Sequence, residues 1–90
     1  AKIRERNKDW SAKNKAYIDR IRRMFGCRIC GENEPVALDF HHLDPAQKDT
    51  EVPRLLGYSR ERLKTEIRKC AILCSNCHRK HHAGLPGFKL

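Results

Sequence analysis

The sequence has no long apolar run, and its apolar stretches are only a few residues long. A membrane-spanning helix needs about 20 mostly apolar residues, so the sequence predicts no transmembrane segment. It also lacks a segment that resembles a signal peptide, and it lacks internal repeats and low-complexity tracts. These absences exclude membrane-spanning and repeat proteins and favour a soluble chain.

Apolar material for a core is also scarce. The chain has 90 residues, of which 39% are hydrophobic and 34% are charged. Chains this short bury too little apolar surface to be comfortably stable and usually need disulfides or a metal. A structural zinc contributes about 10–16 kcal/mol in small metal domains. We therefore expect one small domain whose folding depends on a bound metal.

Acidic residues are few: 11 Asp or Glu stand against 20 Lys or Arg, which leaves a net charge of +9. Residues 1–25 hold nine of the basic and three of the acidic residues, a net +6. A polyanion is the expected partner, and for a protein with cysteine knuckles the usual polyanion is nucleic acid. An anionic membrane surface would need a bulkier apolar stripe than this segment offers.

Cysteine, by contrast, is plentiful. Four of the five cysteines form two C-x-x-C pairs, Cys27/Cys30 and Cys74/Cys77. Each pair makes a knuckle whose two sulfurs reach one ion, and four thiolates satisfy a tetrahedral zinc site. Disulfides are the alternative, but adjacent knuckles favour metal in a chain without a secretory signal. The fifth, Cys70, is most simply a small buried hydrophobic residue.

Residues 1–25 are predicted to form one helix that ends at Gly26. Its apolar residues recur every seven positions and form a narrow stripe, to which Ile21 adds a residue four positions after Tyr17. The stripe consists of Ile3, Trp10, Tyr17, Ile21 and Met24. Asn7 and Asn14 interrupt it. We therefore expect the first half of the helix to need the domain or a partner for order.

Residues 1–26 are predicted to act as a basic arm beside a domain over residues 27–90. A phosphate-contacting arm makes binding strongly salt dependent. A solvated helix face is the plainer alternative, since charge runs are common on surfaces. The candidate nucleic-acid contacts in the arm are Lys13, Lys15, Arg20, Arg22 and Arg23.

Two strands and two further helices are predicted around the knuckles. Residues 36–40 alternate loosely and predict a strand that leads into two histidines, followed by a long connecting loop over 46–58. A helix over 60–69 begins after Ser59 as its cap. Residues 71–73 are a short apolar run, predicted to pair with the first strand. A final helix is predicted with Ser75 or Asn76 as its cap.

All five histidines lie near the knuckles, as a doublet, His41 and His42, and a triplet, His78, His81 and His82. His78 and His82 are four apart, so on a helix they share a face and can chelate one ion; His81 is the rival for this role. Neighbouring side chains of a strand point to opposite faces, so the doublet serves one site only if the strand ends or twists there. Two histidine clusters beside a zinc framework suggest a second, catalytic metal.

Residues 38–42 (L-D-F-H-H) and 74–82 (C-S-N-C-H-R-K-H-H), with Cys27 and Cys30 upstream, resemble the HNH endonuclease family. The resemblance is strongest to its four-cysteine, zinc-stapled branch, which is frequent in bacteriophage and bacterial genomes, and it covers residues 27–84. It implies a small α+β zinc-stapled domain with the ββα-metal (His-Me finger) motif, and the basic N-terminal helix lies outside it. In that motif a β-hairpin packs on a helix with one divalent ion between them.

The same resemblance implies a role for each matching residue. His41 would be a metal ligand, and His42 would be the general base. His78 would be the ligand at the start of the family helix, and His82 would be a third ligand, as in colicin-type nucleases. The cofactors implied are a structural Zn²⁺ on the four knuckle cysteines and one catalytic Mg²⁺, Mn²⁺, Ni²⁺ or Zn²⁺.

One position departs from the family pattern. The middle asparagine, nine residues before His78, is replaced by Lys69. Lysine cannot accept a hydrogen bond, so it cannot orient a neighbouring group as an asparagine carbonyl would. Asp39 and a backbone carbonyl are the candidates for orienting His42, and Asn76 is a candidate helix cap.

The implied activity is metal-dependent hydrolysis of phosphodiester bonds in duplex DNA, with 5′-phosphate and 3′-hydroxyl products. Arg79 and Lys80 would hold backbone phosphates, although simple helix solubility also explains them. A non-catalytic zinc-knuckle module that binds nucleic acid is the competing class, because the charge and the knuckles fit it equally well. The expected location is the cytoplasm of a bacterial or phage-infected host cell.

Overall fold

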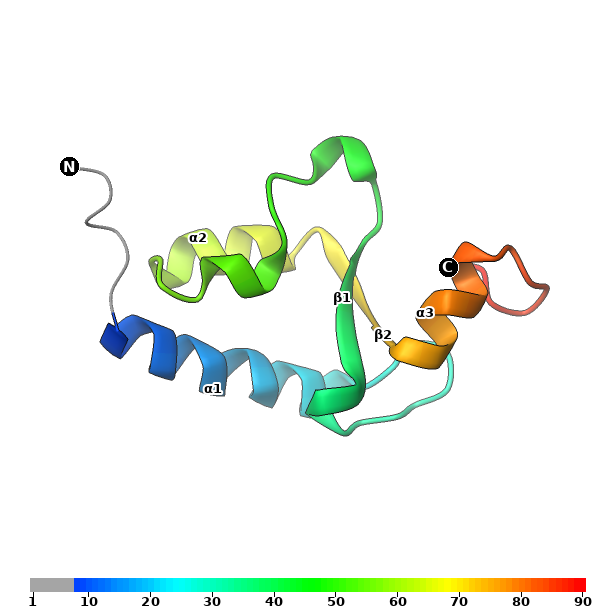
Figure 1. Cartoon of the computed structure of the whole chain (residues 1–90), viewed down its shortest axis with the longest axis horizontal. Coiled ribbons are helices and arrows are strands. Elements are labelled where there is room, and N and C mark those ends of the chain that lie inside the picture. Colours follow the sequence, from blue (N-terminus) through cyan, green and yellow to red (C-terminus); the bar gives the residue numbers. More distant parts are fainter. Residues whose placement is uncertain (1–7) are drawn as a thin grey trace.

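Two short antiparallel strands lie at the centre of the molecule, with two helices on one side of them and a third helix on the other (Figure 1). The computed structural model describes residues 8–90, so the predictions for Ile3 and Asn7 lie outside the described residues. The main elements, in chain order, are α1 (Lys8–Phe25), β1 (Leu38–His42), α2 (Arg60–Ile67), β2 (Cys70–Cys74) and α3 (Ser75–His82). The fold is thus a small α+β arrangement.

The two strands pair as the sequence predicts, with Leu38 opposite Cys74 and His42 opposite Cys70. The first strand starts two residues later than expected because Pro35 begins a 3₁₀ turn over Pro35–Ala37. It continues through the histidine doublet, which therefore belongs to the strand and not to its exit. Alternation along β1 buries Leu38, Phe40 and His42 on one face.

The segment predicted as a plain connecting loop contributes to the core. Within residues 46–58 a 3₁₀ helix, Val52–Leu55, buries both of its terminal side chains. These two residues join Ile18, Phe40 and Leu63 in one hydrophobic cluster. Three-residue spacing puts Val52 and Leu55 on the same side of a 3₁₀ turn, which a pattern search for α-helices or strands overlooks.

The apolar stripe predicted for α1 packs only in its middle, where Tyr17 and Ile21 lie against the hydrophobic core. Trp10 and Met24 are 40% and 68% exposed, whereas Ile18 and Asn14 are buried. Tyr17 and Ile21 are themselves only partly buried. The helix is confirmed over Lys8–Phe25, and its buried residues include Asn14 and Ile18, which lie outside the predicted stripe.

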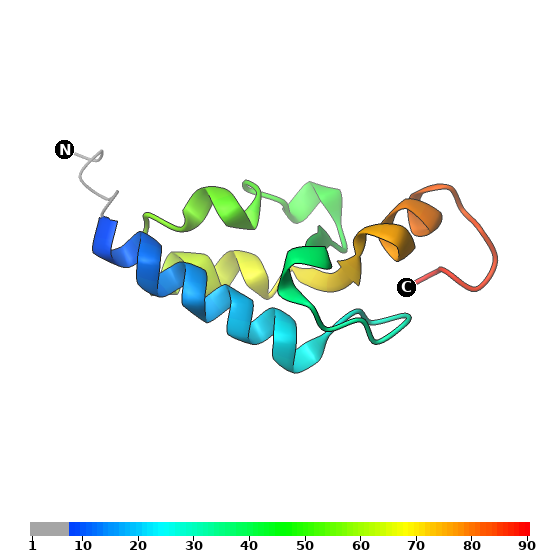
Figure 2. The same ribbon diagram turned by 60° about the horizontal axis from the view of Figure 1, so that its bottom comes forward.

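Asn14, which interrupts the apolar stripe in the sequence, connects α1 to the rest of the fold through its side-chain amide. Its Nδ2 donates to the carbonyl oxygens of Leu56 and Tyr58, both at 2.9 Å. Its Oδ1 accepts from Nε of Arg60 at 2.8 Å. The amide therefore satisfies backbone groups of the segment that leads into α2, and α1 lies along α2 in two views of the molecule (Figures 1 and 2).

Helix α1 shares its core with the rest of the chain. Ile18 is 1% exposed and lies in the same cluster as Phe40 and Leu63. The expected boundary between the basic arm and the domain, at residue 26, coincides with the end of α1, where Gly26 has φ +68°. The hydrophobic core nevertheless continues across this boundary. Across residues 8–90, none of the helices is long and apolar enough to cross a membrane.

Caps define where the two later helices begin. Ser59 Oγ accepts from the backbone N–H of Arg62 at 3.3 Å, which confirms the predicted cap of α2. For α3 the predicted caps, Ser75 and Asn76, are wrong, because the N-cap is Cys74, whose Sγ accepts from the N–H of Cys77 at 3.3 Å. The last residue of β2 is thus the cap of α3, and no loop separates the two elements.

Candidate metal centres

The two knuckles bring four thiols together. Cys27, Cys30, Cys74 and Cys77 each offer a sulfur, and the four sulfurs lie within 4.8 Å of one another. Sγ of Cys30 and Sγ of Cys74 are 3.6 Å apart. Four sulfurs about 2.3 Å from one zinc ion would be about 3.8 Å apart, so the cluster has the spacing of a tetrahedral thiolate site. It can hold a structural metal such as zinc.

The thiols also have the electrostatics of a site that takes a cation. Burial raises the pKa of Cys27, but backbone N–H groups, including those of Ile29 and Cys30, outweigh it and lower this pKa to about 6. Burial raises the pKa of Cys77 to about 12, with contributions from the neighbouring thiols. Four adjacent thiols cannot all ionise unless a positive charge lies among them, and a bound metal supplies that charge.

Glycine is required where the first knuckle turns back on α1. Gly26 has φ +68°, and an added Cβ would lie 3.0 Å from the carbonyl oxygen of Glu32. The N–H of Cys27 donates to that same oxygen at 2.7 Å. The knuckle is further held to the sheet, because the N–H of Arg28 donates to the carbonyl of Ile72 at 2.8 Å.

The three histidines expected to share one ion lie together. His41 comes from β1, and His78 and His82 come from one face of α3; their candidate ligand nitrogens lie within 4.8 Å of one another. Nδ1 of His41 and Nε2 of His78 are 3.1 Å apart. Two imidazole nitrogens about 2.1 Å from one ion in tetrahedral geometry would be about 3.4 Å apart. The three rings therefore form a second candidate metal site.

Asp39 orients one of these rings. Its Oδ2 lies 3.1 Å from Nδ1 of His78, so Nδ1 carries the proton that is donated to the carboxylate, and Nε2 is left to bind a metal. The suggestion that Asp39 orients His42 is wrong. In β1 the Asp39 side chain projects towards α3, on the face opposite to His42.

His41 is suited to metal binding in its neutral form. Burial, followed by the positive charge that the neighbouring imidazoles can carry, lowers the pKa of His41 to about 4. An imidazole binds a metal only when it is unprotonated, so His41 is in the binding state at neutral pH.

His81 lies beside the three histidines of the candidate site, but one of its ring nitrogens is used in another hydrogen bond. Its Nδ1 lies 2.8 Å from the carbonyl oxygen of Phe88, to which it donates. Its ring centroid is 4.9 Å from that of His41. Of the two rivals on α3, His82 is the one that groups with His41 and His78.

The second histidine of the doublet points to the other face of the sheet. His42 is 8% exposed, and its Nε2 lies 2.8 Å from Oε2 of Glu66 on α2. Glu66 also accepts from the N–H of Asp49 at 3.0 Å and from Nζ of Lys69 at 2.9 Å. Burial raises the pKa of the Glu66 carboxyl, but these hydrogen bonds outweigh it and lower this pKa to about 2.

Glu66 is the site residue that the sequence analysis missed. It lies three residues before Lys69, on the buried face of α2, and no apolar periodicity marks a charged residue for burial. The sequence signal that could have identified it is its position, three residues before Lys69, where the resemblance to HNH endonucleases leads one to expect an asparagine. Lys69 does not orient His42 directly, but it holds the carboxylate that contacts His42.

The two faces of β1 meet at one cavity. A cavity of about 240 Å³ is lined by both histidines of the doublet and by His78 and His82. Lys48 and Glu51, which form an ion pair with each other, complete part of its wall. His41 and His42 therefore line one space although they project from opposite faces of β1.

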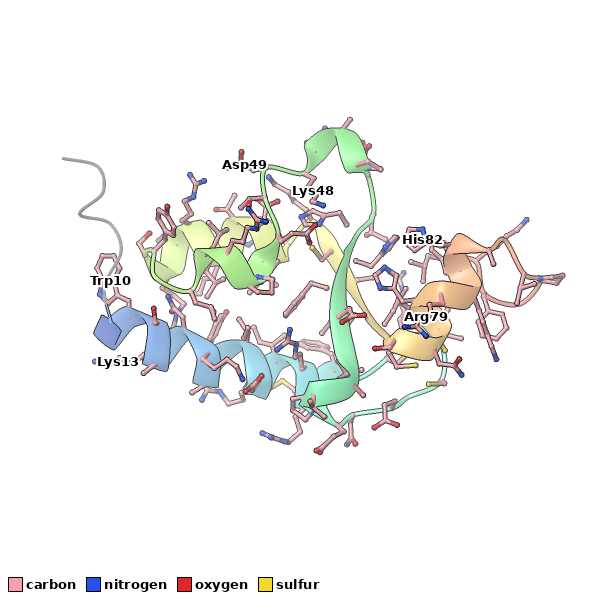
Figure 3. All side chains as sticks on the ribbon, viewed as in Figure 1. Trp10, Lys13, Lys48, Asp49, Arg79 and His82 are labelled. Atoms are coloured by element: carbon pink, nitrogen blue, oxygen red, sulfur yellow. The ribbon has the colours of Figure 1, made fainter. Side chains whose placement is uncertain are left out.

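The predicted nucleic-acid contacts lie at different places. Arg79 is exposed on α3 (Figure 3). Nζ of Lys80 lies over the ring of Phe88, 4.9 Å from its centroid. Lys13 is exposed near the start of α1, at the opposite end of the molecule from His82 (Figure 3).

The other basic residues of α1 differ in exposure. Lys15, Arg20 and Arg23 are exposed. Arg22 is different, because its side chain is only 13% exposed, pairs with Asp19 at 3.0 Å and stacks on a core aromatic ring. The Arg22 guanidinium is thus engaged within the fold.

Taken together, the chain offers a sulfur-only site and, further along α3, an imidazole site beside a buried histidine–carboxylate pair. Thiolates suit zinc, and imidazoles suit transition metals. Comparisons of the chain with protein-family models, with curated proteins and with solved structures found no match. Its function is therefore inferred from its own residues.

Proposed function

We propose that the chain is a metal-dependent DNA endonuclease of the HNH type, with a ββα-metal motif made of β1, β2 and α3. The observation that carries the proposal is the cavity shared by His42 and by the three imidazoles of His41, His78 and His82. A base and a cation site next to each other are what phosphodiester hydrolysis needs. A module that only binds nucleic acid needs neither.

In the proposed reaction His42 takes a proton from a water molecule, which then attacks phosphorus. The three imidazoles would hold one divalent ion, which when bound supplies a Lewis acid for the phosphate oxygens and the departing 3′ oxygen. Asp39, through its contact with Nδ1 of His78, would leave Nε2 of that ring available as a ligand. The bond between phosphorus and the 3′ oxygen would break, and the 3′ oxygen would take a proton from solvent water, which leaves 5′-phosphate and 3′-hydroxyl ends.

The cysteine cluster would hold a structural zinc and would take no part in the reaction. Its role would be positional: Cys74 ends β2 and caps α3, so a metal on the cluster fixes where α3 begins relative to the sheet. His78, one residue after Cys77, is then placed beside His41.

Duplex DNA is the proposed substrate. Exposed cations on both sides of the cavity support this, since phosphates are bound mainly by Lys and Arg. Arg79 lies on the helix that carries the ligands, and Lys48 lines the cavity itself. Figure 3 shows Lys48 on the segment above His82.

Cleavage of supercoiled plasmid tests the proposal. The zinc-loaded protein is incubated with plasmid and with Mg²⁺, Mn²⁺, Ni²⁺ or added Zn²⁺, against a parallel series in excess EDTA. We expect nicked or linear DNA with at least one ion and none with EDTA. No cleavage with any of these ions, with DNA binding intact, would favour the non-catalytic binding module.

A matched pair of variants assigns the activity to the cavity. His42→Ala should lower cleavage by at least about 10²-fold, the usual effect of losing a general base, and should leave DNA affinity within a few fold. His81→Ala, which changes a histidine held by a backbone carbonyl, should keep most of the activity. If both variants cleave like the wild type, the cleavage comes from a contaminating nuclease or from another site.

A further inference from the structure

Three hydrogen-bonding groups surround the buried carboxylate of Glu66, and nothing in the metal site requires them. The Glu66 side chain is 3% exposed, and both of its oxygens are used. Oε2 contacts Nε2 of His42 at 2.8 Å and the N–H of Asp49 at 3.0 Å, and Oε1 contacts Nζ of Lys69 at 2.9 Å. A buried carboxylate with this many donors is held in one orientation.

The charge state of Glu66 determines which nitrogen of His42 carries a proton. Hydrogen bonds keep the pKa of this carboxyl near 2, so it is ionised at neutral pH and can only accept hydrogen bonds. Nε2 of His42 must therefore be the donor. In a neutral imidazole the other nitrogen, Nδ1, is then unprotonated.

We infer that Glu66 is a positioning residue that holds His42 in its Nε2–H tautomer and leaves Nδ1 as the atom that accepts the proton from water. The inference rests on the proposed function for its catalytic consequence, but the tautomer itself does not depend on it. Within residues 8–90, Nε2 is the only His42 nitrogen with a hydrogen-bond partner. Nδ1 is thus left free on a ring that lines the cavity.

Lys69 takes part through Glu66. A lysine at the position of the family asparagine cannot accept a hydrogen bond from a histidine. Here it donates to the carboxylate one helical turn earlier, and the carboxylate makes the contact with His42. The pair Glu66–Lys69 therefore does the orienting that a single asparagine side chain would otherwise do.

The tautomer is measured directly by NMR on protein labelled with ¹⁵N in its histidines, at neutral pH and with zinc on the cysteine cluster. Two-bond ¹H–¹⁵N couplings identify the protonated nitrogen of each ring. We expect a protonated Nε2 and a bare Nδ1 for His42 in the wild type, and a mixture of tautomers in Glu66→Gln. A wild-type His42 with its proton on Nδ1, or on both nitrogens, would overturn the inference.

Kinetics test the consequence. Glu66→Gln keeps the shape of the side chain but removes its charge, and its amide can present either a donor or an acceptor to His42. Losing a carboxylate that fixes a catalytic histidine lowers kcat by about 10⁴-fold in serine proteases, and we expect a loss of about 10²–10⁴-fold, with the KM for DNA and the zinc content unchanged. Glu61→Gln, an exposed position on the same helix, is the control and should change nothing.

A failure of the positioning role of Glu66 can be distinguished from a failure of the proposed nuclease activity. If the wild type cleaves DNA and Glu66→Gln cleaves it equally fast, the positioning role is wrong while the nuclease assignment stands. If the wild type cleaves nothing with any ion, the nuclease assignment fails, and the NMR result alone decides whether Glu66 sets the tautomer. If Glu66→Gln does not fold, the couplings of wild-type His42 decide the inference.

Discussion

Among single residues, three buried polar side chains connect segments that are distant in the sequence. Asn14, His42 and Glu66 are 3%, 8% and 2% exposed. Each meets side-chain or backbone partners that satisfy it, as buried polar groups must be satisfied to avoid a large desolvation cost. In a chain with a small apolar core, these contacts fix the relative placement of α1, β1 and α2.

Asn14→Ala should destabilise the fold. The change leaves two backbone carbonyls without a donor and leaves the guanidinium of Arg60 without its acceptor. We expect a loss of about 1–3 kcal/mol in the free energy of unfolding, measured by urea denaturation at a fixed zinc concentration. Lys13→Ala, on the exposed face of the same helix, should stay within about 0.5 kcal/mol of the wild type. Equal stability of both variants would mean that α1 is not anchored by Asn14.

Because of Glu66, the free energy of unfolding should decrease at low pH. Its carboxyl pKa is lowered from 4.5 to about 2 in the folded protein, so the unfolded chain takes up this proton at a higher pH. The contribution of the carboxylate is therefore complete above about pH 4.5 and is lost as the pH falls towards about 2. Urea denaturation should show the stability difference between wild type and Glu66→Gln shrinking across that window. A constant difference would contradict the lowered pKa.

Part of this residue-level picture was predictable. The spacing of the cysteines predicted their cluster, and the i, i+4 rule predicted that His78 and His82 share a face. The partners of His42 and Asn14 were not predictable in this way, because they lie 24 to 46 residues away. Periodicity records which positions are apolar and carries no information on which buried polar groups will meet.

Among the elements, α3 is the one whose position depends most on metal. Cys74 is at once the last residue of β2, the N-cap of α3 and a member of the cysteine cluster. Helix α3 has eight residues, too few to be stable alone in water. Its orientation must therefore come from the cluster and from its contacts with the sheet.

Removal of zinc should unfold α3 and separate His78 and His82 from His41. A zinc contribution of about 10–16 kcal/mol exceeds the stability expected of so small a domain. Cys77→Ser should lose the metal and most of the helical circular dichroism of α3, whereas Cys70→Ala should keep one zinc per chain, because Cys70 lies outside the cluster. Metal analysis and circular dichroism measure both. A folded, zinc-free Cys77→Ser would contradict the structural role of the cluster.

The elements themselves were largely predictable, because turn residues mark their ends. Gly26 ends α1, Ser59 begins α2, and the short apolar run before Cys74 pairs with the first strand. The 3₁₀ helix Val52–Leu55 was missed, since four residues with a proline have no periodicity to detect. Its burial depends on tertiary contacts with α1 and α2.

For the molecule as a whole, the exposed positive charge is spread along its length. Exposed cations occur on α1 and on α3, with Lys13 and Arg79 towards opposite ends of the molecule (Figure 3), and Lys48 and Arg54 are exposed on the segment between β1 and α2. A duplex that reached both helices would cross the strands and the cavity between them. Salt dependence of DNA binding reports how many of these cations meet phosphates.

Two neighbouring arginines should separate binding from stability. Arg23→Ala removes an exposed cation and should weaken DNA binding, with the slope of log K against log salt reduced by about 1. Arg22→Ala should instead lower the melting temperature, because Arg22 pairs with Asp19 and lies 5.0 Å from the ring of Phe40. DNA titrations at several salt concentrations and thermal unfolding measure the two effects. The reverse pattern would mean that Arg22 is the phosphate contact.

The most direct test of the second metal site is anomalous diffraction from crystals of the zinc-loaded protein soaked in Ni²⁺, recorded on both sides of the nickel and zinc absorption edges. We predict a zinc peak among the sulfurs of Cys27, Cys30, Cys74 and Cys77, and a separate nickel peak bound by nitrogens of His41, His78 and His82. A zinc peak without any nickel between those three rings, in crystals that bind nickel elsewhere, would contradict the proposed catalytic centre.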